Sequence, residues 1–131
     1  EIRTDEVDAG VVDDTVLDRL AALQRPGKVS IVEQVVGLYL DNSSRSLATL
    51  REAMSQRDMS AAMQSAHNLK SSSGHVGAAG LASLFAAIEH AARAGDAARG
   101  ESLLAGAEAG HAQVCARLRQ RLDEDAVATT G

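Results

Sequence analysis

Apolar residues recur every three or four positions along most of the chain, which is the spacing of one face of an α-helix. Short polar breaks divide this pattern into separate runs, which predict helices over about residues 13–23, 30–56, 58–76, 79–94 and 96–122. Asp or Ser begins four of these runs, where a short polar side chain can accept hydrogen bonds from the free amides of the first turn. No run shows the two-residue alternation of a half-buried strand, so the sequence indicates an all-helical protein.

Two parts of the pattern leave an alternative open. Polar residues at 41–44 interrupt the second run and allow a bend there, but the apolar stripe resumes in phase and favours one long helix. Glycines at positions 100, 106 and 110 weaken the last run, because each costs about 1 kcal/mol relative to Ala inside a helix. We still expect that run to form one helix to about Leu122.

The breaks between the later runs are short, so successive helices are expected to be antiparallel neighbours. We therefore predict an all-α fold, an up-and-down antiparallel four-helix bundle with a short additional N-terminal helix. Residues 1–12 are acidic and lack a helical period, so we interpret them as a linker. The bundle domain is expected over residues 13–122, and residues 123–131 are expected to form a flexible tail.

The composition narrows the class of protein. Tyr39 and Phe85 are the only large aromatic residues, so the core must be built mainly from small aliphatic side chains and methionine. The net charge of -5 argues against a nucleic-acid surface and a polybasic membrane contact, and we expect neither partner. A lone Cys115 excludes a disulfide within the chain and fits a reducing compartment. No apolar run approaches the ~18 residues of a membrane span and no signal peptide is visible, so we expect a cytoplasmic location.

His67 is the strongest candidate for chemistry because of its neighbours on the predicted helix. Residues three and four positions apart share a helix face, so Lys70 and Ser71 lie beside His67, with Gly74 one turn further on. Small and apolar residues form a stripe on the other side, at Ala62, Ala66, Leu69 and Ser73. The imidazole is therefore expected to point outward, beside a cation and among groups of little bulk. An imidazole needs those surroundings if a large partner is to deliver a phosphoryl group to it.

The segment 66–78, read Ala-His-Asn-Leu-Lys-Ser-Ser-Ser-Gly-His-Val-Gly-Ala, resembles the signature of histidine-containing phosphotransfer (HPt) domains. The family pattern is His-x-Leu-Lys-Gly-Ser-Ser, followed a few residues later by Gly-Ala. Residues 16–20 also resemble the short first helix of that family, and residues 91–96 resemble its turn between the last two helices. The resemblance covers roughly residues 13–122 and implies a helical bundle, in agreement with the apolar pattern.

The resemblance implies a phosphorelay role. His67 would accept a phosphoryl group from an aspartyl phosphate of one receiver domain and pass it to an aspartate of another. Lys70 would pair with the phosphate as a point charge, and Arg93 of the following helix would reach the same face. Ser71 departs from the family's usual Gly; it is still small, and its hydroxyl can donate to a phosphate oxygen.

The resemblance also sets the expected partners and cofactors. The partners would be receiver domains of response regulators or of the parent protein, and the receiver would supply Mg²⁺. The sequence has no Gly-rich nucleotide loop and no acidic metal cluster on the His67 face, so we expect no cofactor of its own and no ATP site. Because the chain begins at Glu1 rather than Met, we take it as a fragment of something longer. The resemblance implies that this parent is a hybrid sensor histidine kinase, with the domain cut from its C-terminal part. An inner-membrane anchor in that parent is compatible with this expectation.

Two other interpretations remain open at this stage. His67 could be an ordinary surface histidine of a helical binding module that regulates a receiver or an enzyme by contact, without phosphotransfer. A metal site would need histidines to converge, but His67 and His75 lie about 12 Å apart along one helix. His90 and His111 belong to other helices, and we expect the histidines beyond His67 to be scattered and solvated.

Overall fold

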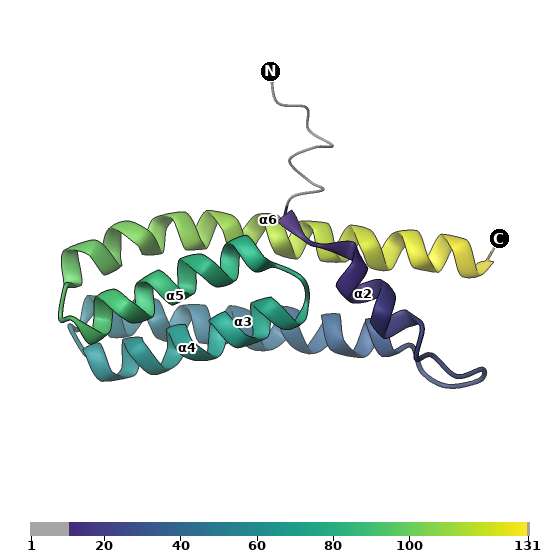
Figure 1. Cartoon of the computed structure of the whole chain (residues 1–131), viewed down its shortest axis with the longest axis horizontal. Helices are drawn as coiled ribbons and strands as arrows, with labels where there is room; N and C mark the ends of the chain where they lie inside the picture. Colours follow the sequence, from purple (N-terminus) through teal and green to yellow (C-terminus); the bar gives the residue numbers. More distant parts are fainter. Residues whose placement is uncertain (1–10, 131) are drawn as a thin grey trace, which may run out of the picture.

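The computed structural model describes residues 11–130, and over that range the chain forms five helices and no strand. The helices are α2 (Asp14–Ala21), α3 (Ile31–Ser55), α4 (Met59–His75), α5 (Ala79–Arg93) and α6 (Ala97–Thr130). Helices α3 to α6 pack in a closed ring, because α3 contacts both α4 and α6, and α5 contacts both α4 and α6. Helix α2 lies at one end, between α6 and the start of α3 (Figure 1). The prediction of a four-helix bundle with a short extra helix is confirmed.

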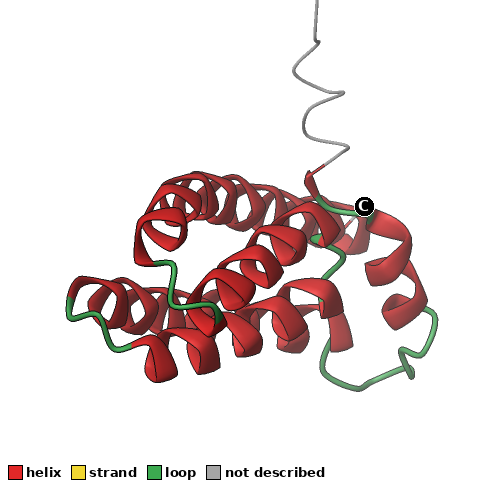
Figure 2. Cartoon of the chain, turned by 60° about the vertical axis from the view of Figure 1, so that its left-hand side comes forward, coloured by secondary structure: helices red, strands yellow, loops and turns green. Residues whose placement is uncertain are grey.

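The helix starts follow the capping residues that the sequence predicts. Their side-chain oxygens accept hydrogen bonds from first-turn amides, in the pairs Asp13–Thr15, Ser30–Glu33, Asp58–Ala61 and Asp96–Arg99. Helix α5 has no such side-chain cap. The connections among α3, α4, α5 and α6 are short, so these helices alternate in direction (Figure 2).

Helix α3 runs without a break through the polar residues 41–44. Ser43 points inward and forms a 2.8 Å hydrogen bond with Nε2 of His111 on α6, while the Ser44 hydroxyl donates to the carbonyl of Leu40. Both hydroxyl groups thus have hydrogen-bond partners, and α3 needs no bend at these polar residues. Our expectation that His111 is solvated was wrong, because its side chain is buried in the core.

Helix α6 continues to Thr130, so the prediction that it ends near Leu122 was wrong. Salt bridges hold this last part: Arg117 pairs with Glu124, and Arg121 pairs with Asp125 one turn later. Residues 123–130 therefore belong to the helix.

The same two arginines attach α2 to the bundle. Arg117 and Arg121 both pair with Asp14, and Arg121 also pairs with Asp18. Each arginine side chain is only slightly exposed. The stems of both arginines are largely covered, while their guanidinium groups pair with the carboxylates of α2.

Close packing explains two of the glycines in α6. A Cβ at Gly100 would lie 2.5 Å from Cε of Met54, and a Cβ at Gly110 would lie 3.3 Å from Cδ1 of Leu81. Both atoms are the ends of flexible side chains, so Met54 or Leu81 would have to shift to admit a Cβ at these positions. At Gly106 nothing lies within 4 Å of the added atom, and the structure shows no packing reason for glycine there.

The N-terminal boundary of the bundle is set by contacts with the turn after α4. The proposed linker falls mostly on residues 1–10, which lie outside the described residues, but Val12 is buried in the core. The amide of Asp13 donates to the carbonyl of Gly77, 2.8 Å away. Gly77 has φ +85°, and a Cβ there would lie 2.6 Å from the carbonyl oxygen of Asp13, so only glycine fits. No helix in the described part of the chain is both long and apolar enough to cross a membrane.

The burial of His111 predicts how the stability of the fold changes with pH. Burial lowers the pKa of His111 in the folded chain, whereas a free imidazole in the unfolded chain titrates near 6.5. Between these two pKa values the unfolded chain holds a proton that the folded chain lacks. The free energy of unfolding should therefore decrease as the pH falls below about 6.5, by at most about 1.4 kcal/mol per pH unit for this one proton. Urea unfolding at a series of pH values measures this slope.

The control is His111→Gln, whose amide can still bond to Ser43 but does not titrate. Its unfolding free energy should lack the part of the slope that is due to His111. The Glu89 carboxyl does not interfere, because its pKa is held below the usual value and its effect appears only at lower pH. An identical slope in the two proteins would contradict the assignment.

Candidate functional site

Helix α4 presents His67 as the sequence predicts. Its inward stripe is fully buried, at Ala62, Ala66, Leu69 and Ser73. The hydroxyl of Ser73 forms a 2.9 Å hydrogen bond with the hydroxyl of Tyr39 on α3, which fixes the rotation of α4 against its neighbour. With that face turned inward, the His67 side chain points outward and is half exposed, at 50%.

A carboxylate from α5 lies at the centre of the site. Oε2 of Glu89 is 3.1 Å from Nδ1 of His67 and 3.2 Å from a guanidinium nitrogen of Arg93, and Oε1 is 2.9 Å from Nζ of Lys70. The Glu89 side chain is only 9% exposed, while its three partners reach solvent. We call these four residues the Glu89 cluster. It joins α4, which carries the imidazole and the ammonium group, to α5, which carries the carboxylate and the guanidinium group.

The charge of Glu89 determines which ring nitrogen of His67 carries the proton. The hydrogen bond from Lys70 lowers the pKa of the Glu89 carboxyl below its usual value, although its burial acts in the opposite direction. An ionised carboxylate can only accept hydrogen bonds, so Nδ1 of His67 must be the donor. In a neutral ring the proton then resides on Nδ1, and the lone pair of Nε2 is free to act as a nucleophile.

The structure brings three of the four candidate residues together. Lys70 and Arg93 both reach the carboxylate that His67 contacts, so the expectation that Arg93 approaches this face agrees with the geometry. Ser71 is exposed one turn from His67 and takes no part in the hydrogen bonds of the Glu89 cluster. It borders the imidazole without contacting the charged groups.

Glu89 was not among the site residues predicted from the sequence. A signal was present, because Glu89 is the only acidic residue in the stretch 59–93 and precedes Arg93 by four positions. It also follows Phe85 by four positions, which puts it at the edge of the apolar face of α5. An acid at the edge of a buried stripe needs a cationic or hydrogen-bonding partner, and the neighbouring helix supplies one.

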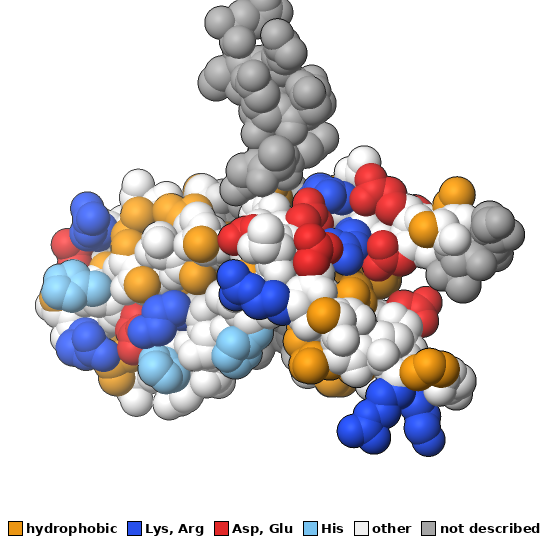
Figure 3. Space-filling view, turned by 45° about the vertical axis from the view of Figure 1, so that its right-hand side comes forward, with side chains coloured by type: hydrophobic (Ala, Val, Ile, Leu, Met, Phe, Trp, Pro, Cys, Tyr) orange, Lys and Arg blue, Asp and Glu red, His pale blue; other side chains and the backbone are white. Residues whose placement is uncertain are grey.

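The surface around the cluster is open and relatively cationic. Gly74 follows His67 on the outer side of α4, and a Cβ added there would meet nothing within 4 Å. The stretch 59–93 carries Lys70 and Arg93 against Glu89, a formal charge of +1, whereas the whole chain carries -5. Figure 3 shows histidine and Lys or Arg side chains close together on one side of the bundle. Among residues 11–130 no three His, Cys, Asp or Glu residues are grouped so that they could hold a metal ion.

The sequence was compared with family models and with curated proteins. A family model described as the Hpt domain matches residues 34–128, which span most of α3 and the helices from α4 to α6. A search of curated proteins found no similar protein. The matched range contains the whole Glu89 cluster and excludes α2.

The Glu89 cluster predicts the tautomer of His67. Because Glu89 accepts from Nδ1, neutral His67 in the wild-type chain should carry its proton there, and ¹⁵N chemical shifts of the ring measure this directly. Glu89→Ala removes the acceptor and should shift the population toward the tautomer protonated on Nε2. Glu89→Gln retains an acceptor oxygen and should keep the wild-type tautomer. Arg93→Ala is the matched control, since it leaves the carboxylate in place. A ring protonated mainly on Nε2 in the wild type would disprove this assignment.

Proposed function

The chain belongs to the histidine-containing phosphotransfer family, the Hpt domains, and from this premise we propose that His67 carries the phosphoryl group. Domains of this family are phosphotransfer modules of phosphorelays rather than kinase catalytic domains. In this proposal His67 takes the group from an aspartyl phosphate of one receiver domain and gives it to an aspartate of another. The observation that carries the assignment is the contact between Nδ1 of His67 and the ionised Glu89, which leaves Nε2 as the nucleophile on the exposed side chain.

The transfer step balances without a cofactor bound to this chain. The lone pair of Nε2 attacks the phosphorus atom, an N–P bond forms, and the P–O bond to the receiver aspartate breaks, leaving its electron pair on the carboxylate. Nδ1 keeps its proton throughout, so the phosphorylated ring becomes cationic. The Glu89 carboxylate, 3.1 Å from Nδ1, stabilises that charge without moving. The second transfer is the same step in reverse, with an aspartate oxygen of the second receiver as the nucleophile.

The cations of the cluster can serve the phosphoryl oxygens. In the unphosphorylated chain Lys70 and Arg93 bond to Glu89, which keeps their charges within reach of the imidazole. A phosphoryl group on Nε2 adds negative charge beside them, and both side chains are long enough to turn toward it. Because Lys70 lies on the same helix face as His67, we assign it the larger effect on the transfer rate. Arg93 is the more exposed of the two and is assigned an auxiliary effect.

The partner in this proposal is a receiver domain, which must approach the imidazole closely. Ser71 and Gly74 leave room for a receiver to approach the imidazole closely, and the hydroxyl of Ser71 can donate to a phosphoryl oxygen. The receiver supplies the Mg²⁺ of the reaction, and a kinase domain elsewhere supplies the phosphoryl group from ATP. We place this chemistry in the cytoplasm, in a parent protein of the hybrid sensor kinase class.

The direct test uses a receiver domain that carries ³²P on its aspartate. Wild-type protein incubated with it and Mg²⁺ should acquire label that is lost in acid and stable in alkali, as expected for a phosphorus–nitrogen bond. His67→Gln should acquire none, because the amide nitrogen is not a nucleophile. His90→Gln on α5 is a control that also removes an exposed histidine and should label like the wild type, since His90 lies outside the Glu89 cluster.

The same experiment distinguishes phosphotransfer from the rival hypothesis, a binding module that acts by contact alone. If the receiver binds tightly to both the wild type and His67→Gln and neither acquires label, contact regulation is supported and phosphotransfer is excluded for that receiver. Label that persists in His67→Gln would assign the acceptor role to another residue.

The charge of Lys70 should affect the rate of transfer and not the fold. Lys70→Ala removes the ammonium group nearest to Glu89, and we expect phosphoryl gain and loss at His67 to slow by about 10- to 100-fold. Rapid-quench labelling measures the rate, and circular dichroism checks that helicity is unchanged. Arg99→Ala on α6 removes an exposed cation that is not part of the Glu89 cluster and serves as the control. An unchanged rate in Lys70→Ala would show that this ammonium group has no part in the reaction.

A further inference from the structure

The carboxylate of Glu89 is almost inaccessible to solvent and depends on the hydrogen-bond donors around it. Its side chain is only 9% exposed, and its two oxygens accept from Nδ1 of His67, Nζ of Lys70 and a guanidinium nitrogen of Arg93. An ionised carboxylate that is shielded from water is stable only while at least one donor takes the place of water. Any change in the site must therefore leave Glu89 with a donor.

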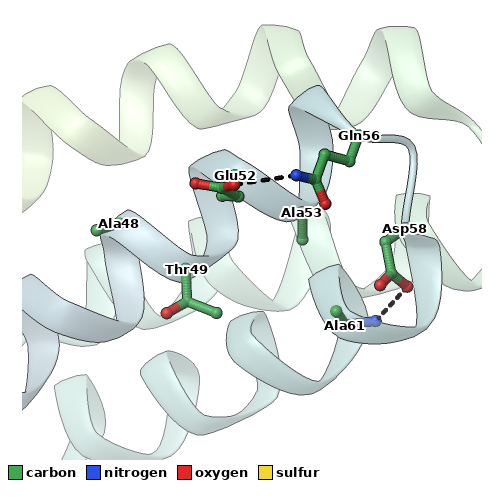
Figure 4. Close-up of a pocket in the computed structure, with 7 residues that line it drawn as sticks. All are labelled: Ala48, Thr49, Glu52, Ala53, Gln56, Asp58 and Ala61. Carbon is green, nitrogen blue, oxygen red and sulfur yellow. Dashed lines mark hydrogen bonds between the residues drawn. The ribbon is translucent and has the colours of Figure 1, made fainter.

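Two other carboxylates of the bundle do not have this requirement. Glu52 and Asp58 lie near the turn between α3 and α4 (Figure 4), and both are exposed. Glu52 accepts a hydrogen bond from the side chain of Gln56, and Asp58 accepts one from the amide of Ala61. Water can replace either donor at such exposed positions. The dependence on a fixed donor is thus a consequence of where Glu89 lies, not of its being an acid.

Phosphorylation of His67 withdraws two of the three donors from Glu89. In the proposed function Lys70 and Arg93 turn toward the phosphoryl oxygens, and their side chains are free to do so because they are 37% and 62% exposed. The third donor cannot leave in this way. The phosphorus atom is attached to Nε2, so the ring can point Nε2 to the partner while Nδ1 stays at Glu89. The Nδ1–H group is therefore the donor of the cluster that remains with the carboxylate.

Other titratable groups of the packed helices leave this pair undisturbed. Tyr39 of α3 faces α4, but its hydroxyl is bonded to Ser73, and burial raises the pKa of Tyr39 to about 12, so it stays neutral. His75 of α4 and His90 of α5 are exposed and take no part in the hydrogen bonds of the Glu89 cluster. Within residues 11–130, α6 supplies no ion-pair partner to Glu89. The charges that act on the ring are therefore those of the cluster itself.

We propose that Glu89 is a positioning residue that keeps the proton on Nδ1 of phosphorylated His67, and that this proton allows the ring to leave when the phosphoryl group passes to the second receiver. The inference rests on the proposed function and adds the group that controls its second step. With Nδ1 protonated, the electron pair of the N–P bond returns to Nε2 and the ring leaves as neutral imidazole. Without that proton the same step produces an imidazolate anion, which is a strong base and therefore a much poorer leaving group.

The step needs no proton transfer. An aspartate oxygen of the receiver forms the new P–O bond as the N–P bond breaks. His67 is then again a neutral ring with its proton on Nδ1, which is the state that accepts the next phosphoryl group. Lys70 and Arg93 return to Glu89, as in the unphosphorylated chain. The cluster thus completes a cycle in which only the two cations move.

The inference predicts how the phosphorylated ring titrates. An opposite charge within about 4–6 Å favours the charged form of an ionisable group, and Oε2 of Glu89 is 3.1 Å from Nδ1. The phosphorylated ring should therefore keep its proton to a higher pH than it would beside a neutral acceptor. Glu89→Gln supplies this comparison, because its amide oxygen still accepts from Nδ1 but carries no charge.

The direct measurement is a pH titration of the phosphorylated ring by ³¹P NMR. Each protein is phosphorylated with phosphoramidate, a small donor that needs no partner, and the signal of His67 is identified by its absence in His67→Gln. The titration midpoint should be higher in the wild type than in Glu89→Gln by about one pH unit or more.

The functional measurement is transfer from phosphorylated His67 to an unlabelled receiver with Mg²⁺. The same receiver is used for every variant, so that its own pH dependence cancels in the ratio of rates. Above the midpoint of Glu89→Gln, its rate should fall relative to the wild type by about 10-fold per pH unit, until the wild-type ring also loses its proton.

Two variants make the result specific. Glu52→Gln is the matched control, since it makes the same substitution at an exposed acid outside the Glu89 cluster, and its midpoint and transfer rate should equal those of the wild type. Arg93→Ala removes a charge from the cluster but keeps the carboxylate, so its midpoint should not fall.

If circular dichroism shows that Glu89→Gln has lost helicity, the phosphorylated wild type decides alone. Its ¹⁵N shifts should show Nδ1 protonated at about pH 8, above the ordinary imidazole value of about 6.5. An unprotonated Nδ1 at this pH would overturn the inference.

Equal midpoints in the wild type and Glu89→Gln, or an equal fall in Arg93→Ala, would overturn the role of Glu89 and leave phosphotransfer at His67 intact. Failure of the proposed function has a different result. The receiver then neither labels His67 of the wild type nor accepts label from it, and the role of Glu89 in transfer is overturned together with that function.

Discussion

The arrangement of the site depends on one buried carboxylate and on the groups that neutralise it. Glu89 is nearly inaccessible to solvent, and an ionised carboxylate in that position requires partners. It takes them from both helices of the pair, with His67 and Lys70 on α4 and Arg93 on α5. The same requirement therefore holds the two helices together at this level, orients the imidazole and gathers positive charge beside it. The exposed rim of the cluster is cationic and its only acid is buried, which suits a surface that must receive a phosphoryl group.

The rest of the bundle acts as a rigid support for this cluster. With a single phenylalanine and a single tyrosine, the core cannot gain its specificity from interlocking aromatic rings. It uses small side chains, which permit close approach of helices, and a few buried hydrogen bonds, which fix their rotation. Tyr39 bonds to Ser73 on α4, and Ser43 bonds to His111 on α6, so α3 is tied to both neighbours by polar contacts. Burial raises the pKa of Tyr39 to about 12 and lowers that of His111, so both groups are uncharged near neutral pH.

The two ends of the bundle differ in how their charged side chains are paired. The end that carries α2 is held by arginines whose side chains lie largely between helices, where Arg117 and Arg121 neutralise Asp14. Apolar residues of α3 and of the loop that precedes it remain exposed at this end, beside the exposed cations Arg25 and Lys28. The other end of the α3–α4 pair keeps the exposed carboxylates Glu52 and Asp58.

The sequence by itself determined the helices, most of their boundaries and the outward direction of His67. These features depend on local rules: apolar residues at helical spacing define a buried face, Asp or Ser caps a first turn, and a residue opposite the stripe of Ala62 and Leu69 must point to solvent.

Only the tertiary structure decided which groups from other helices meet that face. The pairing of His67 with Glu89 joins residues 22 positions apart, and that of Ser43 with His111 joins residues 68 positions apart. Such contacts depend on the rotation and axial offset of one helix against another, which no single-helix pattern contains. The burial of His111 has the same origin, because its partner Ser43 lies on another helix. The extension of α6 past Leu122 has a different one, because its salt bridges join residues of the same helix.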